Sequence, residues 1–238
     1  RIYDFGVTDD GLFWYAMELL EGEPLGSLVR REGALEPGRA VHLLAQAARA
    51  LAEAHALGMV HRDLKPDNLF VSVVGGEPDF LKVLDFGIVK AEGHVELTKT
   101  GTFAGTPAYA SPEQLSGESV TPASDVYSLG IVLFFALTGT PPFEGESARV
   151  AVEHIQRDPP RLDERTPGLV APDLEVIVAR CLSKSPADRF ADGAALAHAL
   201  ASTAAAHLRS SVPEPQLVSS KPPAPEERSA PTKIEKRV

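Results

Sequence analysis

Residues 61–68 read HRDLKPDN and lead directly into the apolar run LFVSVV at residues 69–74. The eight positions hold two carboxylates, two fixed cations, an imidazole, an amide and a proline. A solvent-exposed loop can carry such a mixture by chance. A loop that holds metal ions and phosphate requires it, because oxygen ligands bind hard cations and basic side chains pair with phosphate. The sequence on either side of this stretch decides between the two interpretations.

The composition is that of a globular protein. The chain has 238 residues, of which 44% are apolar and 24% are charged. A net charge of −10 disfavours sequence-independent binding to nucleic acid or to anionic lipid. The single cysteine, Cys181, excludes an intrachain disulfide and fits a reducing compartment, so we expect the protein in the cytoplasm. Cys181 lies in a helical pattern and is expected to be a small buried hydrophobic residue.

No membrane span is expected within the chain. The longest strongly apolar run, residues 126–137, is shorter than the roughly 20 apolar residues that a transmembrane helix needs, and it predicts a buried core helix. No signal peptide opens the chain. The first residue is Arg1 rather than methionine, so we expect the chain to be part of a longer protein. A membrane tether beyond Val238 is left open.

Periodicity predicts a little β-structure first and helices after it. The opening residues 1–22 are expected to form two strands joined by the turn TDDG, and residues 68–73 and 80–85 two more joined by GGEPD. Apolar spacings of three and four residues predict helices over residues 36–58, 123–138, 147–157, 173–183 and 192–207. Residues 87–112 show no sustained period, which is typical of a functional loop. Residues 210–238 are proline-rich and polar, which predicts a disordered linker, with a Pro-rich peptide ligand as the alternative.

Two further motifs follow HRDLKPDN in a fixed order, namely DFG at residues 85–87 and GTPAYASPEQ at residues 105–114. A lone DFG recurs by accident, but the ordered set does not. It resembles the C-terminal lobe of a protein kinase. Lys65 and the GTPAY sequence resemble the Ser/Thr branch of the family, and residues 125–139 are similar to bacterial Ser/Thr kinases of the eukaryotic-like type. The resemblance runs from Arg1 to about Ala205.

The resemblance implies an α+β, protein-kinase-like fold that consists mainly of the helical C-terminal lobe. It implies two residual small-lobe strands and the start of the hinge over residues 1–20, the C-terminal lobe over 21–205 and a Pro-rich disordered tail over 206–238.

The sequence departs from the family pattern in the small lobe. No G-x-G-x-x-G occurs, and Lys90 follows the DFG, so it is not the small-lobe strand lysine. The regulatory-helix glutamate is missing as well. A chain cut from an intact kinase and a natural remnant both explain the departure. The intact motif residues and the start at Arg1 favour the cut chain.

The implied activity is transfer of the ATP γ-phosphate to Ser/Thr hydroxyls of proteins. This reaction needs positioning and neutralisation of charge more than covalent help. By resemblance, Asp63 accepts the proton of the substrate hydroxyl and Lys65 reaches the γ-phosphate. Asn68 and Asp85 are expected to ligate Mg²⁺, which also binds the phosphates of ATP. Mn²⁺ is the alternative ion.

Other residues carry over from the family one at a time. Met17 resembles the gatekeeper of the adenine pocket, Glu18 and Leu20 the hinge residues that face the adenine edge, and Phe70 part of the pocket floor. Ordinary packing of a buried strand is the alternative for these four.

Six residues are expected to support the site. His61 is expected to pack on Phe86, beside Gly87, in a supporting rather than an acid–base role. Asp125 resembles the acid that holds the catalytic loop through backbone N–H groups. Glu113 and Arg189 resemble a buried ion pair of the family.

The loop between DFG and GTPAY carries several threonines. By resemblance, Thr106 hydrogen-bonds Asp63 and Lys65, while Thr98 and Thr100 are sites of autophosphorylation. A phosphate there adds roughly −1.5 to −2 charges. Arg62 is the expected partner of that phosphate. Ordinary polar residues in a mobile loop are the alternative.

Three functional classes remain in view. The first is a protein Ser/Thr kinase that phosphorylates proteins, including other copies of itself, and binds no nucleic acid. The chain alone is expected to be inactive or weakly active. The second is a catalytically inactive scaffold that binds a partner near residues 146–157 or through the tail. The third is a small-molecule phosphotransferase, which the GTPAYASPEQ segment disfavours because such kinases generally lack it.

Overall fold

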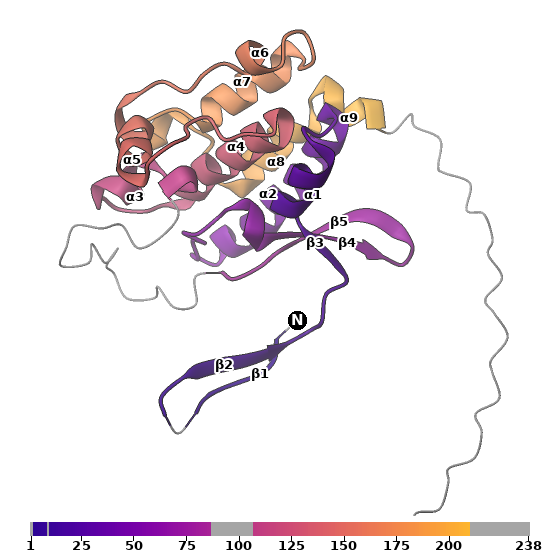
Figure 1. The fold of residues 1–238 in the computed structure, drawn as a ribbon, viewed down its shortest axis with the longest axis vertical. Coiled ribbons are helices and arrows are strands. Elements are labelled where there is room, and N and C mark those ends of the chain that lie inside the picture. The colour runs from indigo at the N-terminus through magenta and orange to yellow at the C-terminus, as the bar shows by residue number, and fades with distance from the viewer. Residues whose placement is uncertain (1, 9, 87–106, 210–238) are drawn as a thin grey trace, which may run out of the picture.

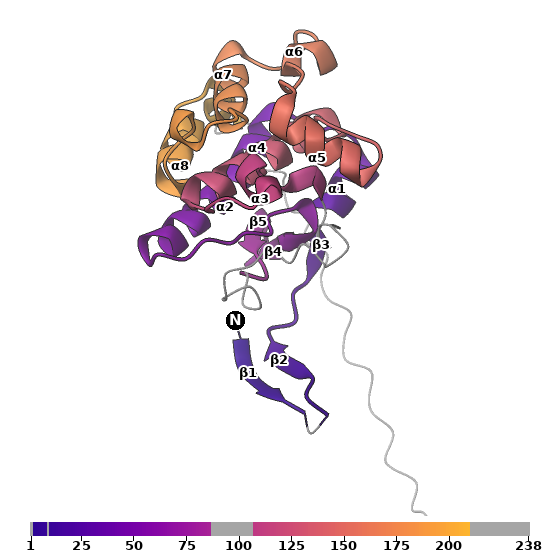
Figure 2. The same ribbon diagram turned by 90° about the vertical axis from the view of Figure 1, so that its left-hand side faces the viewer.

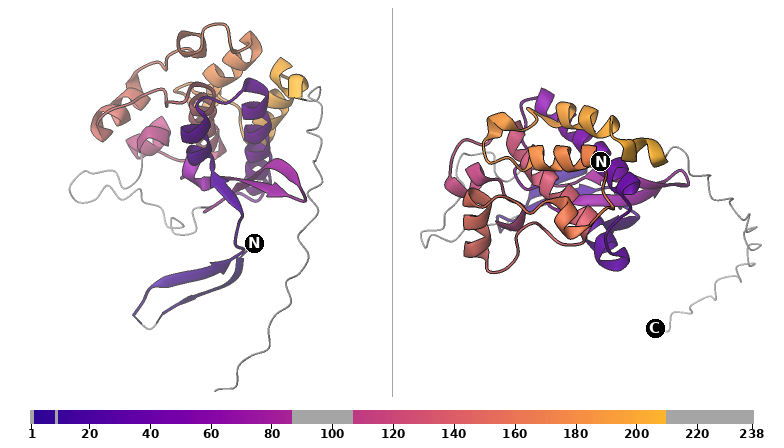
Figure 3. Two further views of the ribbon diagram at one scale, coloured as in Figure 1. Left: turned by 45° about the vertical axis from the view of Figure 1, so that its right-hand side comes forward. Right: turned by 90° about the horizontal axis from the view of Figure 1, so that it is seen from above.

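The computed structural model describes residues 2–8, 10–86 and 107–209. In this part of the chain the helices gather into one body, and a two-stranded hairpin projects from it (Figures 1 and 3). A three-stranded sheet lies between the helical body and the hairpin (Figure 2). The architecture confirms the mixed α and β fold that the sequence predicts.

Both sheets are antiparallel. In the hairpin, β1 (Ile2–Val7) pairs with β2 (Phe13–Met17). In the second sheet the order is β3 (Gly22–Pro24), β4 (Leu69–Val74) and β5 (Glu77–Val83). The turn between β4 and β5 is shorter than the predicted GGEPD, because Gly75 and Gly76 alone, with φ of 63° and 90°, supply the left-handed conformations of a two-residue turn.

The predicted helices over residues 36–58, 123–138, 147–157 and 173–183 are confirmed as α2 (Pro37–Ala56), α4 (Pro122–Thr138), α5 (Ser147–Gln156) and α7 (Pro172–Cys181). The sequence did not predict three short helices, α1 (Leu25–Glu32), α3 (Pro112–Ser116) and α6 (Leu162–Arg165). Single 3₁₀ turns occur at η1 (Pro66–Asn68), η2 (Pro107–Tyr109) and η3 (Pro186–Asp188). No described helix is both long enough and apolar enough to cross a bilayer.

The helix predicted over residues 192–207 is instead two helices, α8 (Gly193–Ala201) and α9 (Ala204–Arg209). The hydroxyl of Thr203 donates to the carbonyl of Leu200 and accepts from the N–H of Ala206 at 3.2 Å. It therefore closes one helix and caps the next. Helix α9 also runs into the range that the sequence assigned to the tail from residue 206.

Helix α4 forms the centre of the body. Its residues from Ala123 to Leu137 are all buried, and Tyr127 and Phe134 are among the largest fully buried side chains. A helix that is apolar all round is stable only when other elements cover every face. Here α2, α7 and α8 pack around α4.

Two glycines allow backbones to approach closely. A Cβ on Gly193 would lie 2.4 Å from the carbonyl oxygen of Ala48, so the start of α8 rests on the backbone of α2. A Cβ on Gly130 would lie 2.5 Å from the Cβ of Cys181, where α4 meets α7. Cys181 is buried, as the sequence predicts, and burial raises the pKa of its thiol to about 12.

We expect Gly193→Ala to lower the free energy of unfolding by about 1–3 kcal/mol, because the added methyl forces α8 away from α2. Ala194→Ser adds one heavy atom at the next, exposed position of α8 and is expected to change stability by less than about 0.5 kcal/mol. Urea unfolding of the two variants checks this. Equal midpoints would show that α8 is not held at this distance.

Candidate active site

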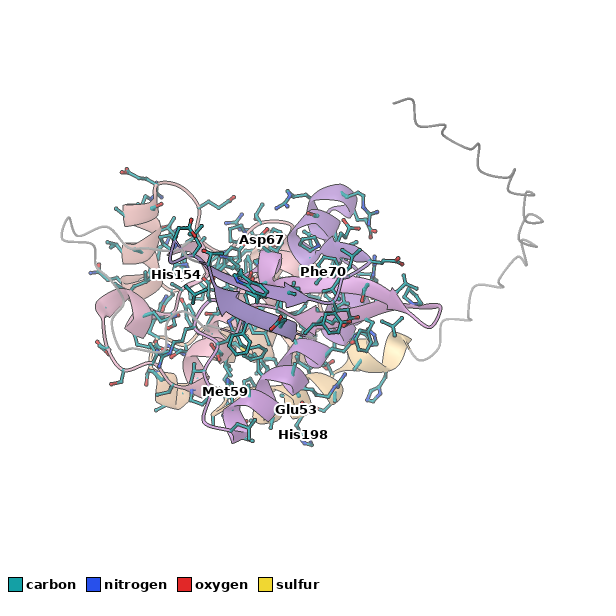
Figure 4. All side chains as sticks on the ribbon, turned by 90° about the horizontal axis from the view of Figure 1, so that it is seen from below. Glu53, Met59, Asp67, Phe70, His154 and His198 are labelled. Atoms are coloured by element: carbon teal, nitrogen blue, oxygen red, sulfur yellow. The ribbon has the colours of Figure 1, made fainter. Side chains whose placement is uncertain are left out.

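The HRDLKPDN stretch is a loop that leaves the end of α2 and enters β4 through η1. His61, Leu64, Pro66 and Asn68 are buried, whereas Asp63 and Lys65 are only partly buried. Asp67 is exposed (Figure 4). The apolar and neutral positions thus fix the loop, and its charged groups remain accessible.

Three of the predicted site residues contact one another. The Nζ of Lys65 lies 3.1 Å from Oδ2 of Asp63. The Nδ2 of Asn68 donates to the Asp63 carbonyl oxygen at 2.8 Å and lies 3.4 Å from Asp63 Oδ2. A cation and an amide therefore fix the orientation of the Asp63 carboxylate.

Leu84 joins this loop to the segment that carries Asp85. The N–H of Leu84 donates to the carbonyl of Asn68 at 2.8 Å, and its carbonyl accepts from Nε2 of His61 at 2.8 Å. Asp85 follows directly, with an exposed side chain and a φ of 53°. The two bonds hold the backbone at Asp85 next to Asn68.

His61 is fully buried and acts as a support. Its ring centroid lies 4.8 Å from that of Phe86, the contact that the sequence predicts. A carbonyl oxygen only accepts, so the Nε2 that faces Leu84 carries the proton. The other nitrogen, Nδ1, accepts from the N–H of Asp63 at 3.3 Å. Both nitrogens are engaged in holding backbone, which fits the expected supporting role.

Asp125, on the first turn of α4, holds the start of the loop through backbone N–H groups. Its Oδ2 accepts from the N–H of His61 at 2.8 Å, and its Oδ1 accepts from the N–H of Arg62 at 2.9 Å. His55 lies 2.9 Å from Asp125 Oδ2 through Nε2. This nitrogen carries the proton, because His55 Nδ1 accepts from the N–H of Gly193 at 3.1 Å.

The backbone at Arg62 is strained. Its φ of 68° lies in the left-handed region, which costs a non-glycine residue on the order of 1–3 kcal/mol. The bond from its N–H to Asp125 offsets part of this cost. Gln114, on α3, donates from Nε2 to the Arg62 carbonyl at 2.7 Å and offsets more. Sequence analysis missed Gln114, although it is the last residue of the GTPAYASPEQ motif.

The expected adenine-pocket residues lie on β2 and β4 and on the segment between β2 and β3. Met17 ends β2 with 39% of its surface exposed, and Phe70 lies partly buried on β4 (Figure 4). Leu20 is partly buried between β2 and β3. Glu18 pairs with Lys82 of β5 at 2.9 Å, and the hydrogen bond from Lys82 lowers the pKa of Glu18.

A second link joins β2 to the site. The Tyr15 hydroxyl donates to Oδ1 of Asp85 at 3.0 Å. This bond raises the pKa of Tyr15. Four further predicted residues lie outside the described part of the chain, namely Gly87, Thr98, Thr100 and Thr106.

Glu113 and Arg189 form the buried ion pair that the sequence predicts. Two parallel bonds of 2.7 and 2.9 Å join the guanidinium to the carboxylate. Arg189 also donates to the carbonyls of Ser183, Lys184 and Ala123. Burial alone would raise the pKa of Glu113, but hydrogen bonds from Arg189 and Ser124 outweigh it and the pKa falls below its usual value.

Comparison with known proteins decides the family. Residues 1–201 match the family described as Protein kinase domain. The chain belongs to the protein kinase family. This confirms the family that the motifs suggest.

Two curated relatives of this chain are bacterial proteins. It is 42% identical over 200 residues to the serine/threonine-protein kinase pkn3 of Myxococcus xanthus, covering 82% of this chain and 37% of that protein. It is 41% identical over 209 residues to the serine/threonine-protein kinase PknA of Mycobacterium tuberculosis, covering 86% of this chain and 47% of that protein. The chain thus spans less than half the length of these kinases.

A solved kinase domain has the same fold. The crystal structure of the Mycobacterium tuberculosis PknI kinase domain superimposes with a TM-score of 0.64 and 26% sequence identity. The match covers 84% of this chain and 69% of the PknI chain. The protein-kinase-like fold expected from the sequence is therefore confirmed.

Asn68 and Asp85 of this kinase offer a donor set that suits Mg²⁺. Asn68 donates from Nδ2 in both contacts with Asp63, so its Oδ1 is the atom able to ligate a cation. Over the described ranges, no group of three or more His, Cys, Asp or Glu side chains is placed to hold a metal ion. Mg²⁺ is usually bound by one or two protein ligands together with water and substrate phosphates, so one amide oxygen and one carboxylate match its needs.

We expect Glu113→Gln to lower the free energy of unfolding by about 3–5 kcal/mol, because it leaves the buried Arg189 charge without a counter-ion. Arg149→Gln removes one side of an exposed ion pair with Glu153 and is expected to cost at most about 1 kcal/mol. Urea denaturation of both variants measures the difference. A Glu113→Gln midpoint as close to wild type as that of Arg149→Gln would contradict the role assigned to this pair.

Proposed function

We propose that the complete protein containing this chain transfers the γ-phosphate of ATP to Ser or Thr hydroxyls of proteins. One observation carries the proposal. Asp63, Lys65 and Asn68 contact one another, and Leu84 holds the backbone at Asp85 beside them. Membership of the kinase family and the bacterial Ser/Thr kinases among its relatives support it.

Each residue has a role that its contacts allow. The Asp63 carboxylate, oriented by Lys65 and Asn68, accepts the hydroxyl proton of the substrate. Lys65 neutralises charge on the γ-phosphate, because its ammonium is only partly buried and lies beside the Asp63 carboxylate. Asn68 and Asp85 hold Mg²⁺, and the ion, when bound, neutralises charge on the phosphates of ATP.

The proposal includes autophosphorylation of the loop that contains Thr98 and Thr100. Arg62 is the cation nearest to Asp63 in sequence, and its backbone is fixed at both the N–H and the carbonyl. A guanidinium on a fixed backbone pairs well with a phosphate. Phosphorylation would then order the loop around the site.

The chain as it stands is proposed to bind ATP weakly. It contains no glycine-rich phosphate loop. The β1–β2 hairpin exposes large apolar side chains, with 63% of Tyr3, 69% of Phe5 and 65% of Val7 accessible. Apolar area of this extent calls for a covering surface, which further small-lobe structure would supply.

The test uses the full-length gene product that contains this chain. We expect Asp63→Asn to lower the rate of phosphate transfer by about 10²- to 10⁴-fold while Mg²⁺-dependent ATP binding persists. Asp85→Asn is expected to abolish that binding. Asp67→Asn, which alters an exposed carboxylate in the same loop, is the matched control. It is expected to leave both the rate of phosphate transfer and the binding of ATP unchanged. Transfer of labelled phosphate and calorimetric titration with ATP give the two readouts.

A wild-type protein that neither binds ATP nor labels any protein would overturn the proposal and favour the inactive scaffold. Transfer to a small alcohol or amine, but to no protein, would favour the third class.

A further inference from the structure

His154 is a fully buried imidazole on a helix that is largely exposed. Over α5 only Val150 and His154 are buried, and they face the same side, one turn apart. Figure 4 marks His154 on the α5 side of the helical body. A buried polar ring in this position must have partners for both nitrogens, or it would cost stability.

Both nitrogens of His154 have partners, and they come from two other elements. Nε2 lies 3.2 Å from the carbonyl oxygen of Ala108, in η2. Nδ1 lies 2.9 Å from the hydroxyl of Tyr127, in α4. Because a carbonyl oxygen only accepts, Nε2 carries the proton and Tyr127 donates to Nδ1. The result is a directed chain of hydrogen bonds from α4, through α5, to η2.

The surroundings keep this imidazole neutral and fixed. Burial, with a smaller contribution from the Lys184 ammonium, lowers the pKa of His154 to about 4. The ring of Phe143 meets it edge-on, with 4.9 Å between centroids. Lys184 donates to the His154 carbonyl at 2.8 Å and so holds the end of α5. The ring therefore has one orientation and one tautomer in which both hydrogen bonds form.

The position of Ala108 gives these contacts a functional meaning. Ala108 belongs to GTPAYASPEQ, and we expect the acceptor peptide to lie on this segment because its last residue, Gln114, is bonded beside Asp63, the proposed acceptor of the substrate proton. The other end of that segment is held as well, because Gln114 donates to the Arg62 carbonyl next to Asp63. His154 of α5 thus contacts the start of the GTPAYASPEQ segment, and the end of that segment is bonded to the HRDLKPDN loop.

We propose that His154 is a positioning residue for the substrate: its Nε2–H fixes the backbone at Ala108, and thereby the surface on which the acceptor peptide lies. The proposal rests on the proposed protein kinase function. It assigns no contact between His154 and the reacting atoms. It requires that loss of the Nε2–H donor weaken peptide binding and leave ATP binding alone.

Two variants of His154 distinguish loss of the Nε2–H donor from loss of the imidazole ring. Gln at position 154 places an amide N–H near the site of Nε2 and keeps a donor for Ala108. Asn places its amide near Nδ1 only and leaves the Ala108 carbonyl without a donor. The full gene product is assayed with a synthetic peptide of residues 94–104, which contains Thr98 and Thr100. His198→Asn, at an exposed histidine of α8, is the control.

We expect His154→Asn to raise KM for the peptide about five- to tenfold, the equivalent of one hydrogen bond, with KM for ATP unchanged. His154→Gln is expected to stay within about twofold of wild type. Amide hydrogen exchange of residues 107–111 should accelerate in the Asn variant and not in the control, while exchange in α7 stays the same. The proposal would be overturned if His154→Asn and His154→Gln had the same KM for the peptide. It would also be overturned if KM for ATP rose in His154→Asn as much as KM for the peptide.

The exchange measurement also separates the two proposals. If wild-type protein phosphorylates no peptide but exchange at residues 107–111 still responds to Asn and not to Gln, the positioning contact stands and the kinase function fails. If exchange does not respond, the positioning role fails whatever the activity.

Discussion

The fold depends on one buried carboxylate. Asp125 lies on the central helix α4 with 1% of its surface exposed and accepts from two backbone N–H groups and from His55. Burying the Asp125 carboxylate without such donors would cost several kcal/mol of stability. The backbone at His61 and Arg62 is therefore held where its N–H groups donate to this carboxylate. His55 in turn accepts from Gly193, which brings the packing of α8 on α2 into the same network. The position of the HRDLKPDN loop is therefore determined by the helical core.

The same arrangement recurs around the site. Three segments around the site are each held by a side chain that comes from another element. Gln114 of α3 holds Arg62, His154 of α5 holds Ala108, and Arg189 holds Glu113. Loops placed in this way keep accessible functional groups while their backbones remain ordered. The left-handed conformation at Arg62 persists because hydrogen bonds act on both sides of that residue.

The sequence predicted what local pattern and motif determine. Long helices with a clear apolar period were found, and so were Asp63, Lys65 and Asn68, which lie close together along the chain. The Asp125 and Glu113–Arg189 contacts were expected only because the family resemblance supplied them. His55, Gln114 and His154 were missed, because their partners lie far away in sequence and no period marks them. The short helix α1 was missed because propensity over so few residues is weak. The break at Thr203 was missed because it depends on local hydrogen bonds of the Thr203 hydroxyl with Leu200 and Ala206, which the apolar period does not mark.

The projecting β1–β2 hairpin governs how the protein behaves at high concentration. Among the described strands this hairpin forms a two-stranded sheet of its own, and its exposed aromatic rings offer a surface to which another copy can add. The net charge of −10 opposes such encounters through mutual repulsion between molecules. At physiological ionic strength this repulsion extends only about 8 Å. Colloidal stability of the chain thus depends on the balance between this screened repulsion and contact between the exposed apolar side chains, and added salt weakens the repulsion further.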